Sequence, residues 1–298
     1  MDLVVGATGF VGGLVARQLS AQGRHVRALV RGGAGHAGAS ALAAAGVAVL
    51  DGDLTDFASV ARACAGCGTV VCTATAMPNA GGDALRRIDH EGVLNLIAAA
   101  EAAGVARCVY ISYSRNIRTE SPLSRAKRGC EARLESGRMD YVILQPSFFM
   151  EVWLGPHLGF DVAGGHVRIY GDGKAAVSYV SGRAVAAFAT SAATRRGELR
   201  EKVQVGGPEP LSQLEAVAHF ERALGRRMTL DHVPVSALEA QHRSGDPLQQ
   251  AFAALMLGYA QGDAIPEASD NAARFGVTLT SLPDYAAGFK VPGPRGNP

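Results

Sequence analysis

The first dozen residues constrain the fold more than any other stretch of the chain. Residues 2–5 (Asp-Leu-Val-Val) have the composition of a short buried strand, and they lead directly into the turn Gly6-Ala7-Thr8-Gly9-Phe10-Val11-Gly12. A helical run over 14–21 follows. A strand, a glycine-rich turn and a helix in this order predict the first unit of a dinucleotide-binding fold.

Each glycine of the turn has a separate task. Gly6 allows a sharp turn at the end of the strand, Gly9 lets the backbone approach a pyrophosphate, and Gly12 lets the helix pack closely on the strand. Free amides and the positive end of the helix dipole then face the phosphates. We expect Thr8 and the backbone of Phe10 and Val11 to make these phosphate contacts.

Strand-like and helical segments continue to alternate after the turn. This alternation predicts a doubly wound parallel sheet of the Rossmann type. Further strands are expected at 25–30, 47–50, 69–73, 107–111, 141–144 and 202–205, and helices at 40–45, 57–65, 83–103, 122–136 and 183–193, with a loop over 77–82.

Beyond Met150 the regular pattern is lost. We expect short strands at 166–170 and 177–180 and, after 207, mainly helices over 211–225 and 235–260. The predicted organisation is a cofactor-binding domain over 1–148 and 172–207, with a smaller, mostly helical, substrate-facing domain over 149–171 and 208–291. A disordered tail is expected over 292–298.

Composition excludes several classes of function. The net charge is +2, which is too small for a nucleic-acid-binding surface, and no apolar run approaches the length of a membrane span. The five cysteines and the absence of an export signal indicate reduced thiols in a cytoplasmic protein. Cys64-Ala65-Gly66-Cys67 has no second metal-ligand pair, so no metal site is expected. A homodimer is left open.

The residues after the second and third strands bear on the choice of cofactor. Arg31 stands where an acidic residue would hold a free ribose 2′-hydroxyl, and a guanidinium suits a 2′-phosphate instead. The sequence therefore favours NADP(H) over NAD(H), with a solvated loop charge as the alternative for Arg31. Asp53, just past the third strand, could accept a hydrogen bond from the adenine amino group.

Taken together, these motifs resemble the atypical and extended short-chain dehydrogenases, and most of all the NmrA-like group with its quinone, triphenylmethane and isoflavone reductases. Besides the glycine turn and Arg31, the resemblance rests on Gly52-Asp53-Leu54-Thr55-Asp56, on 104–112, on Lys127 followed by Glu131, and on 141–151. It implies that Asp53 and Leu54 bracket the adenine. It also implies a cofactor set completed by Thr73, Ala74, Thr75 and Lys127 at the nicotinamide ribose and by Pro146, Ser147 and Phe149 at the carboxamide.

The chain departs from the family pattern at one position. Short-chain dehydrogenases commonly carry a tyrosine four residues before the active-site lysine, and this position is Leu123 here. Lys127 is then either a general acid or a cofactor anchor. Tyr113 is a candidate proton donor, with packing at the sheet rim as its alternative.

An aromatic, largely uncharged set follows the sixth strand. Its members indicate a flat apolar acceptor such as a quinone or an enone, unless they simply fill the core: Phe148, Phe149, Met150, Trp153, Tyr170 and Tyr179. The main hypothesis is an NADPH-dependent reductase that transfers hydride to a small conjugated or aromatic acceptor. A non-catalytic NADP(H) sensor with a protein partner and a sugar-nucleotide epimerase or dehydratase are the alternatives.

Overall fold

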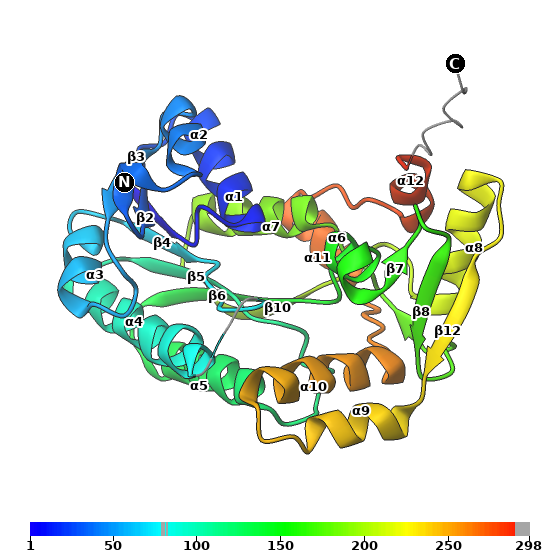
Figure 1. Cartoon of the computed structure of the whole chain (residues 1–298). Coiled ribbons are helices and arrows are strands. Elements are labelled where there is room, and N and C mark those ends of the chain that lie inside the picture. The colour runs from blue at the N-terminus through cyan, green and yellow to red at the C-terminus, as the bar shows by residue number, and fades with distance from the viewer. Residues whose placement is uncertain (79–80, 82, 290–298) are drawn as a thin grey trace.

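The computed structural model describes residues 1–78, 81 and 83–289, and a seven-stranded parallel sheet lies at its centre (Figure 1). The predicted α/β fold with a doubly wound sheet is confirmed. The predicted tail over 292–298 and part of the predicted loop over 77–82 lie outside the described residues. The strands of this sheet are β1 (Asp2–Val5), β2 (Val26–Val30), β3 (Ala48–Asp51), β4 (Thr69–Cys72), β5 (Arg107–Ile111), β6 (Asp140–Pro146) and β10 (Arg200–Val205).

The order of the strands is β10-β6-β5-β4-β1-β2-β3. The chain builds the sheet outward from β1 to β3, then returns to the other side of β1 with β4. Between β1 and β4 the helical connections leave in opposite directions, which opens a crevice outside the carboxyl ends of these two strands. All neighbouring strands are parallel, so their carboxyl ends meet at one edge of the sheet. We call it the carboxyl edge.

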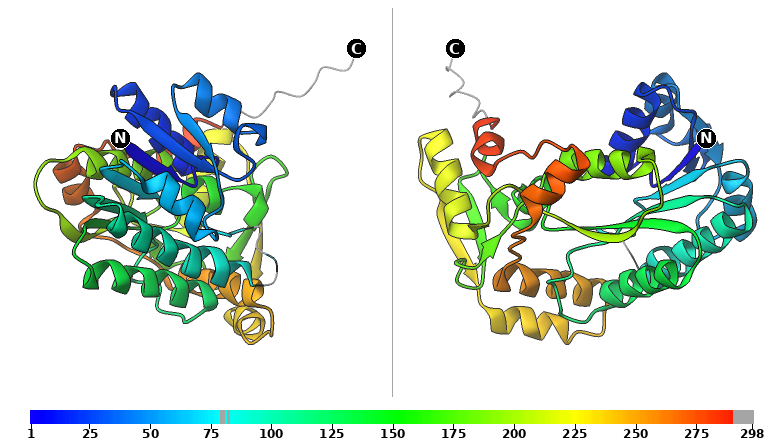
Figure 2. Two further views of the ribbon diagram at one scale, coloured as in Figure 1. Left: turned by 90° about the vertical axis from the view of Figure 1, so that its left-hand side faces the viewer. Right: turned by 180° about the vertical axis from the view of Figure 1, so that it is seen from behind.

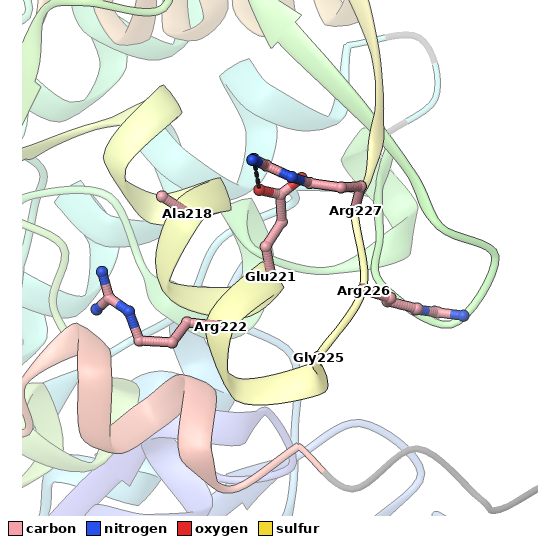
Figure 3. Close-up of a pocket in the computed structure, with 6 residues that line it drawn as sticks. All are labelled: Ala218, Glu221, Arg222, Gly225, Arg226 and Arg227. Carbon is pink, nitrogen blue, oxygen red and sulfur yellow. Dashed lines mark hydrogen bonds and ion pairs between the residues drawn. The ribbon is translucent and has the colours of Figure 1, made fainter.

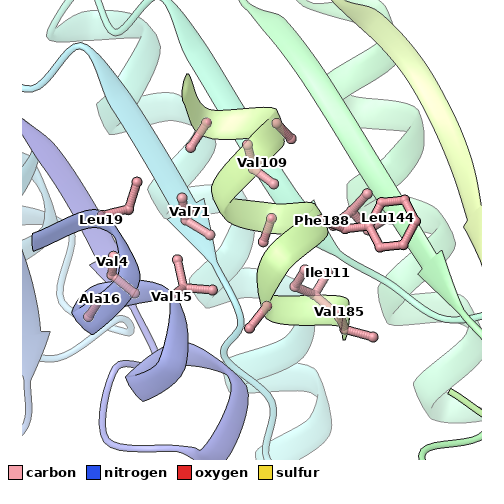
Figure 4. Packing of buried hydrophobic residues seen from close by; sticks show 14 of the residues in the cluster. Val4, Val15, Ala16, Leu19, Val71, Val109, Ile111, Leu144, Val185 and Phe188 are labelled. Atoms are coloured by element: carbon pink, nitrogen blue, oxygen red, sulfur yellow. The ribbon is translucent and has the colours of Figure 1, made fainter. Parts of the chain in front are cut away.

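Helices cover both faces of the sheet, and Figure 2 shows the resulting layers. Apolar residues of the sheet, α1 and α7 form the first core, which includes Val4, Val71 and Phe188 (Figure 4). The second core lies on the opposite face and includes Tyr110 and Cys130. The first face carries α1 (Phe10–Ala21), α2 (Ala39–Ala44), α7 (Gly182–Thr194) and α11 (Ala268–Phe275), and the second carries α3 (Phe57–Cys64), α4 (Val93–Ala102) and α5 (Pro122–Ser136).

Side-chain caps explain where several of these helices begin. Asp56 accepts a hydrogen bond from the Ala58 amide at the start of α3. Ser121 forms a capping box with Ser124 at the start of α5, with Pro122 in the first turn. The predicted helix over 83–103 instead begins with a π-helical segment, Leu85–Gly92, which continues into α4.

The C-terminal part of the chain forms a second, smaller unit beside the sheet. The prediction of a mostly helical unit missed a three-stranded sheet, in which β12 pairs in parallel with β8 and β7 pairs antiparallel with β8. The elements of this unit, including the three strands of its sheet, are α6 (Met150–Trp153), β7 (Phe160–Asp161), β8 (His166–Tyr170), β9 (Ala176–Val177), β11 (Leu211–Ser212), α8 (Gln213–Leu224), β12 (Thr229–Val233), α9 (Val235–His242), α10 (Pro247–Gln261) and α12 (Leu282–Ala287).

Two stretches depart from the predicted elements and ranges. The strand expected over 177–180 is the short β9, followed by a single bridge between Phe149 and Val180. Within the range 208–291, α11 packs on α7 and β10 rather than on the second unit, because Phe275 belongs to the core of the main sheet. The rest of the two-domain division remains a prediction.

All five cysteines are buried and none forms a disulfide. Burial raises the pKa of the Cys64 thiol to about 12, so this thiol of the Cys-x-x-Cys pair is protonated at neutral pH. Within 1–78, 81 and 83–289, the helices are too short or too polar to cross a membrane.

Close backbone packing holds the first turn in place. A Cβ atom at Gly12 would lie 2.2 Å from the carbonyl oxygen of Gly6, and a Cβ atom at Gly6 would lie 2.6 Å from Thr73 Oγ1. Gly6 also has a φ of +87°, which favours glycine. The close-packing role expected for Gly12 follows directly from these contacts.

We predict that Gly12→Ala lowers the free energy of unfolding by roughly 1–3 kcal/mol, because the new methyl group overlaps backbone atoms that cannot move away easily. Urea unfolding monitored by circular dichroism measures this change. Gly68→Ala is the matched control, since a Cβ atom at Gly68 would meet nothing within 4 Å. Equal stability of the two variants would show that the turn adjusts to the added methyl group.

Candidate functional site

The carboxyl edge gathers most of the predicted site residues. Gly6 follows β1, Arg31 follows β2, Asp53 comes shortly after β3, and Thr73 follows β4. Pro146 ends β6 and Ser147 comes next. Residues far apart in the sequence thus lie along one side of the sheet, as the topology rule for open parallel sheets requires of a ligand site.

The glycine turn has the properties of a pyrophosphate cradle. Gly9 is the N-cap of α1, and no side chain caps the helix there, whereas α5, α7 and α8 each carry a serine cap. The first amides of α1 are therefore available to a ligand. Thr8 and Phe10 are exposed beside them. These residues fit the pyrophosphate of a dinucleotide, as the sequence predicts.

Arg31 and Asp53, both predicted to hold the adenosine part of the cofactor, are close enough for the Arg31 charge to act on the Asp53 carboxylate. Burial raises the pKa of Asp53, but hydrogen bonds from the amide and hydroxyl of Thr55 and the charges of Arg31 and Arg87 outweigh it, so that the pKa lies below its ordinary value. Asp53 Oδ1 accepts both bonds from Thr55 at 2.8 Å. The carboxylate is thus ionised and held in place at neutral pH, and Arg31 remains exposed.

The three residues after β4 that are predicted to contact the ribose, Thr73, Ala74 and Thr75, differ in their surroundings. Thr73 Oγ1 lies 3.2 Å and 3.3 Å from the carbonyl oxygens of Val5 and Gly6, so this hydroxyl ties β4 to the glycine turn. Ala74 is half-buried and Thr75 is exposed. Leu54, expected at the adenine, is buried against Gly92.

Lys127 is buried beneath the ends of β4 and β5. Its Nζ atom lies 3.4 Å from Asp89 Oδ1 and 3.4 Å from the carbonyl oxygen of Ile111. Asp89 is fully buried in the π-helical segment, and its Oδ2 accepts a hydrogen bond from the Ala76 amide at 2.8 Å. The ion pair therefore connects α5, the start of α4 and the segment after β4.

Leu123, one turn before Lys127 on α5, lies in a small apolar cluster. It is buried with Leu85 and Ala251, and partly buried apolar residues surround them: Ala76, Met77, Ala84, Leu248 and Leu255. Three of these residues come from α10, which packs beside α5 (Figure 1). At the position where a tyrosine would offer a hydroxyl, this chain has the buried apolar side chain of Leu123.

Tyr113 is half-buried and its ring stacks on the guanidinium of Arg128, 4.4 Å from Cζ to the ring centroid. Burial raises the pKa of the Tyr113 phenol against the opposing effect of the Arg128 charge, so the phenol is protonated at neutral pH. Arg128 also pairs with the buried carboxylate of Glu131. The role of Tyr113 as a proton donor remains a prediction.

The residues after β6 belong to a buried polar network. Glu131 accepts hydrogen bonds from Ser112 and Gln145, which join α5 to β5 and β6. Ser147 Oγ lies 3.4 Å from the carbonyl oxygen of Asp263. Pro146 is also buried, and Phe149 is half-buried.

A third buried carboxylate, after Asp89 and Glu131, lies at the junction with the C-terminal unit. Asp263 is 1% exposed, and its Oδ1 accepts hydrogen bonds from Ser114 Oγ at 2.7 Å and Asn116 Nδ2 at 2.8 Å. Its Oδ2 has no partner among the described residues. Asp263 thereby links the segment after β5 to the segment between α10 and α11.

Five of the six residues predicted to line the substrate pocket are packed together inside the second unit, whereas Phe149 packs against the first core. Members of this group contact one another and Tyr259: the Phe148 and Trp153 rings are 4.7 Å apart, and the hydroxyl groups of Tyr179 and Tyr259 are 2.5 Å apart. Each of the five residues is less than 9% exposed: Phe148, Met150, Trp153, Tyr170 and Tyr179. This arrangement matches the core-filling alternative.

Sequence reasoning missed three buried carboxylates near the carboxyl edge: Asp89, Glu131 as a network centre, and Asp263. The spacing of Glu131 from Lys127 places both on one side of α5 and could have indicated a shared environment. Asp89 lies among Arg86, Arg87 and Glu91, which are typical of a solvated helix surface. No local pattern marks Asp263.

Comparison with known proteins agrees with this geometry. A family described as NAD(P)H-binding matches residues 6–196, which include the glycine turn and the strand ends. The chain belongs to this NAD(P)H-binding family. The resemblance to NmrA-like short-chain dehydrogenases is thereby confirmed, as is a nicotinamide dinucleotide cofactor.

The proteins and solved structures that this chain is similar to differ in their described roles. An NAD(P)H azoreductase of Xenophilus azovorans is 28% identical over 302 residues, covering 100% of this chain and 94% of that protein. A photosystem II assembly factor of Synechocystis sp. is 29% identical over 239 residues, which cover 79% of this chain and 71% of that protein. The structure of an NADPH-dependent quinone oxidoreductase of Escherichia coli, solved with NADPH, matches with a TM-score of 0.79 at 22% identity. The match covers 96% of this chain and 99% of that chain.

We predict that Arg31→Ala weakens NADPH binding roughly tenfold, because a charge-assisted hydrogen bond to the 2′-phosphate is worth about 1.5–3 kcal/mol, and the exposed position favours the lower end. NADH binding should hardly change. Fluorescence titration with both cofactors measures the difference, with Arg62→Ala on the exposed face of α3 as the control. An equal loss of affinity for NADPH and NADH would show that Arg31 does not bind the 2′-phosphate.

Proposed function

We propose that the protein is an NADPH-dependent reductase that delivers hydride to a small apolar conjugated or aromatic acceptor, such as a quinone or an enone. The observation that carries this proposal is the apolar cluster around Leu123, one turn before Lys127 on α5. A phenol at this position serves the alcohol chemistry of related enzymes. Apolar surroundings at this position, with no hydroxyl, instead suit an acceptor that takes hydride directly.

The chain contributes mainly by holding the cofactor and excluding water. The first amides of α1 would hold the pyrophosphate, Arg31 the 2′-phosphate, and Asp53 and Leu54 the adenine. When bound, the reduced nicotinamide supplies a hydride, which carries two electrons to the electrophilic atom of the acceptor. The matching proton reaches the other end of the conjugated system from water or from Tyr113.

Lys127 is proposed as a cofactor anchor rather than as the proton donor. Its ammonium group is already paired with Asp89 and bonded to the Ile111 carbonyl, which fixes it under the strand ends. One N–H direction remains for a ribose hydroxyl, since an ammonium group has three donors. Asp89 would position Lys127 and, through Ala76, the segment that follows β4.

A non-catalytic role is the second candidate, and one comparison favours it: a relative is described as a photosystem II assembly factor. Such a protein would bind NADP(H), signal its redox state to a protein partner, and turn over no acceptor. The epimerase or dehydratase alternative is disfavoured by Leu123, because that chemistry needs the missing phenol.

We predict that the protein oxidises NADPH in the presence of at least one acceptor from a panel of quinones, enones, imines and azo or triphenylmethane dyes. NADPH absorbance measures turnover, and heat-inactivated protein gives the background rate. Tight NADPH binding without turnover of any acceptor would contradict the reductase proposal and favour the sensor.

We predict that Lys127→Met raises the Kd for NADPH roughly 10-fold to 100-fold, because a hydrogen bond from a charged donor is worth about 1.5–3 kcal/mol. The turnover number at saturating NADPH should fall much less. A large fall in turnover with unchanged NADPH affinity would instead assign the acid role to Lys127.

The control for Lys127→Met must account for the charge that the variant leaves behind. An unpaired buried Asp89 can destabilise the fold by about 3–5 kcal/mol. Lys127→Met combined with Asp89→Asn removes both charges, while the amide oxygen of the introduced side chain can still accept from the Ala76 amide. Lys174→Ala, in an exposed turn, controls for the loss of a lysine elsewhere.

A further inference from the structure

A hollow of about 410 Å³ opens beside Tyr113. It lies where 113–120 leads from β5 into the first turn of α5. Helices that follow parallel strands begin at the carboxyl edge, so the hollow opens at the edge that holds the cofactor site. Its floor includes Ile117, which is buried under Gly258 of α10. The volume is in the range of small-molecule sites.

The walls of this hollow carry an excess of positive charge. Glu120 is the acidic residue among the lining residues, and it faces four arginines: Arg115, Arg118, Arg125 and Arg128. Glu120 pairs with Arg125 at 2.8 Å and Glu267 pairs with Arg115 at 3.1 Å, but all four side chains are solvent-exposed. Exposed pairs of this kind are weak and are easily exchanged for a ligand. Among the described residues, Arg118 has no ion pair.

One wall of the hollow is already rigid. Arg128 stacks on the ring of Tyr113, donates a hydrogen bond to the Ser114 carbonyl oxygen at 2.8 Å and pairs with Glu131. Tyr113 contributes an aromatic side chain to the lining, and the guanidinium groups offer donors with the geometry that a carboxylate or sulfonate accepts. The hollow thus combines an aromatic side chain with anion recognition.

We propose that this hollow binds the acidic group of the acceptor, so that the preferred substrates are conjugated or aromatic molecules with a carboxylate or a sulfonate. The reduction of the bound ligand rests on the proposed reductase function, whereas its binding in the hollow does not. A second arginine-lined hollow, of about 390 Å³, lies at the end of α8 (Figure 3). It belongs to the second unit and supplies a control residue, Arg222.

The test compares three ligands by calorimetry on the protein saturated with NADP⁺: an anthraquinone monosulfonate, an anthraquinone monocarboxylate and the uncharged hydroxymethylanthraquinone. The double variant Arg115→Gln, Arg118→Gln removes two exposed charges. We expect it to bind both anions roughly fivefold to tenfold more weakly and the uncharged ligand with little change. Arg222→Gln should leave all three affinities unchanged.

The same ligands are then offered with NADPH, and the outcomes separate the two proposals. If the double variant binds the anions more weakly but the unaltered protein oxidises no NADPH with any of the three ligands, the anion-site proposal is supported and the reductase proposal is overturned. Reduction of all three ligands with no preference for the anions keeps the reductase and overturns the anion site. Equal weakening of all three ligands in the double variant also overturns it.

Salt dependence provides a test on the unaltered protein, should the double variant fold poorly. Added sodium chloride screens exposed charges, so the anions should bind progressively more weakly while the uncharged ligand does not. Identical salt dependence for charged and uncharged ligands would overturn the proposal.

Discussion

The whole site depends on a close backbone contact between the end of β1 and the first turn of α1. Gly12 approaches the Gly6 carbonyl so closely that no side chain fits between them, and Thr73 bonds to the same carbonyl from β4. This contact fixes the direction of α1 and the spacing of the two strands at the centre of the sheet. The amides that face a dinucleotide phosphate are placed as a result.

Buried charges align the other strand ends around this centre. The Lys127–Asp89 pair connects α5 to the segments after β4 and β5, and Glu131 connects α5 to β5 and β6. Burying charge is costly, and well-packed apolar residues would often be as stable. We therefore interpret both networks as devices that hold the strand ends in register with α5, where the nicotinamide side of the cofactor would lie.

The sequence predicts the cofactor half of the molecule well because regular apolar spacing and glycine positions are local signals. Strand β12 (Thr229–Val233) escapes prediction because four of its five residues are exposed, so it has no buried face, and its partner β8 is about 60 residues away. The charged residues around Asp89 predict a solvent-exposed position, but in the structure Asp89 lies in the π-helical segment and is fully buried. The aromatic set shows the opposite error, in which the sequence suggests a site that the packing fills. Its composition indicated a substrate pocket, but the Phe148 and Trp153 rings pack against Tyr259.

The Ser114–Asp263 hydrogen bond joins residues 149 positions apart. A contact of such sequence separation forms late, because the loop that it closes must first lose its conformational freedom. On a ribosome, β5 is complete long before the segment after α10 has emerged, so Ser114 and Asn116 remain hydrated until then. We therefore expect the polar junction between the two units to assemble late, only after the segment that carries Asp263 has been synthesised.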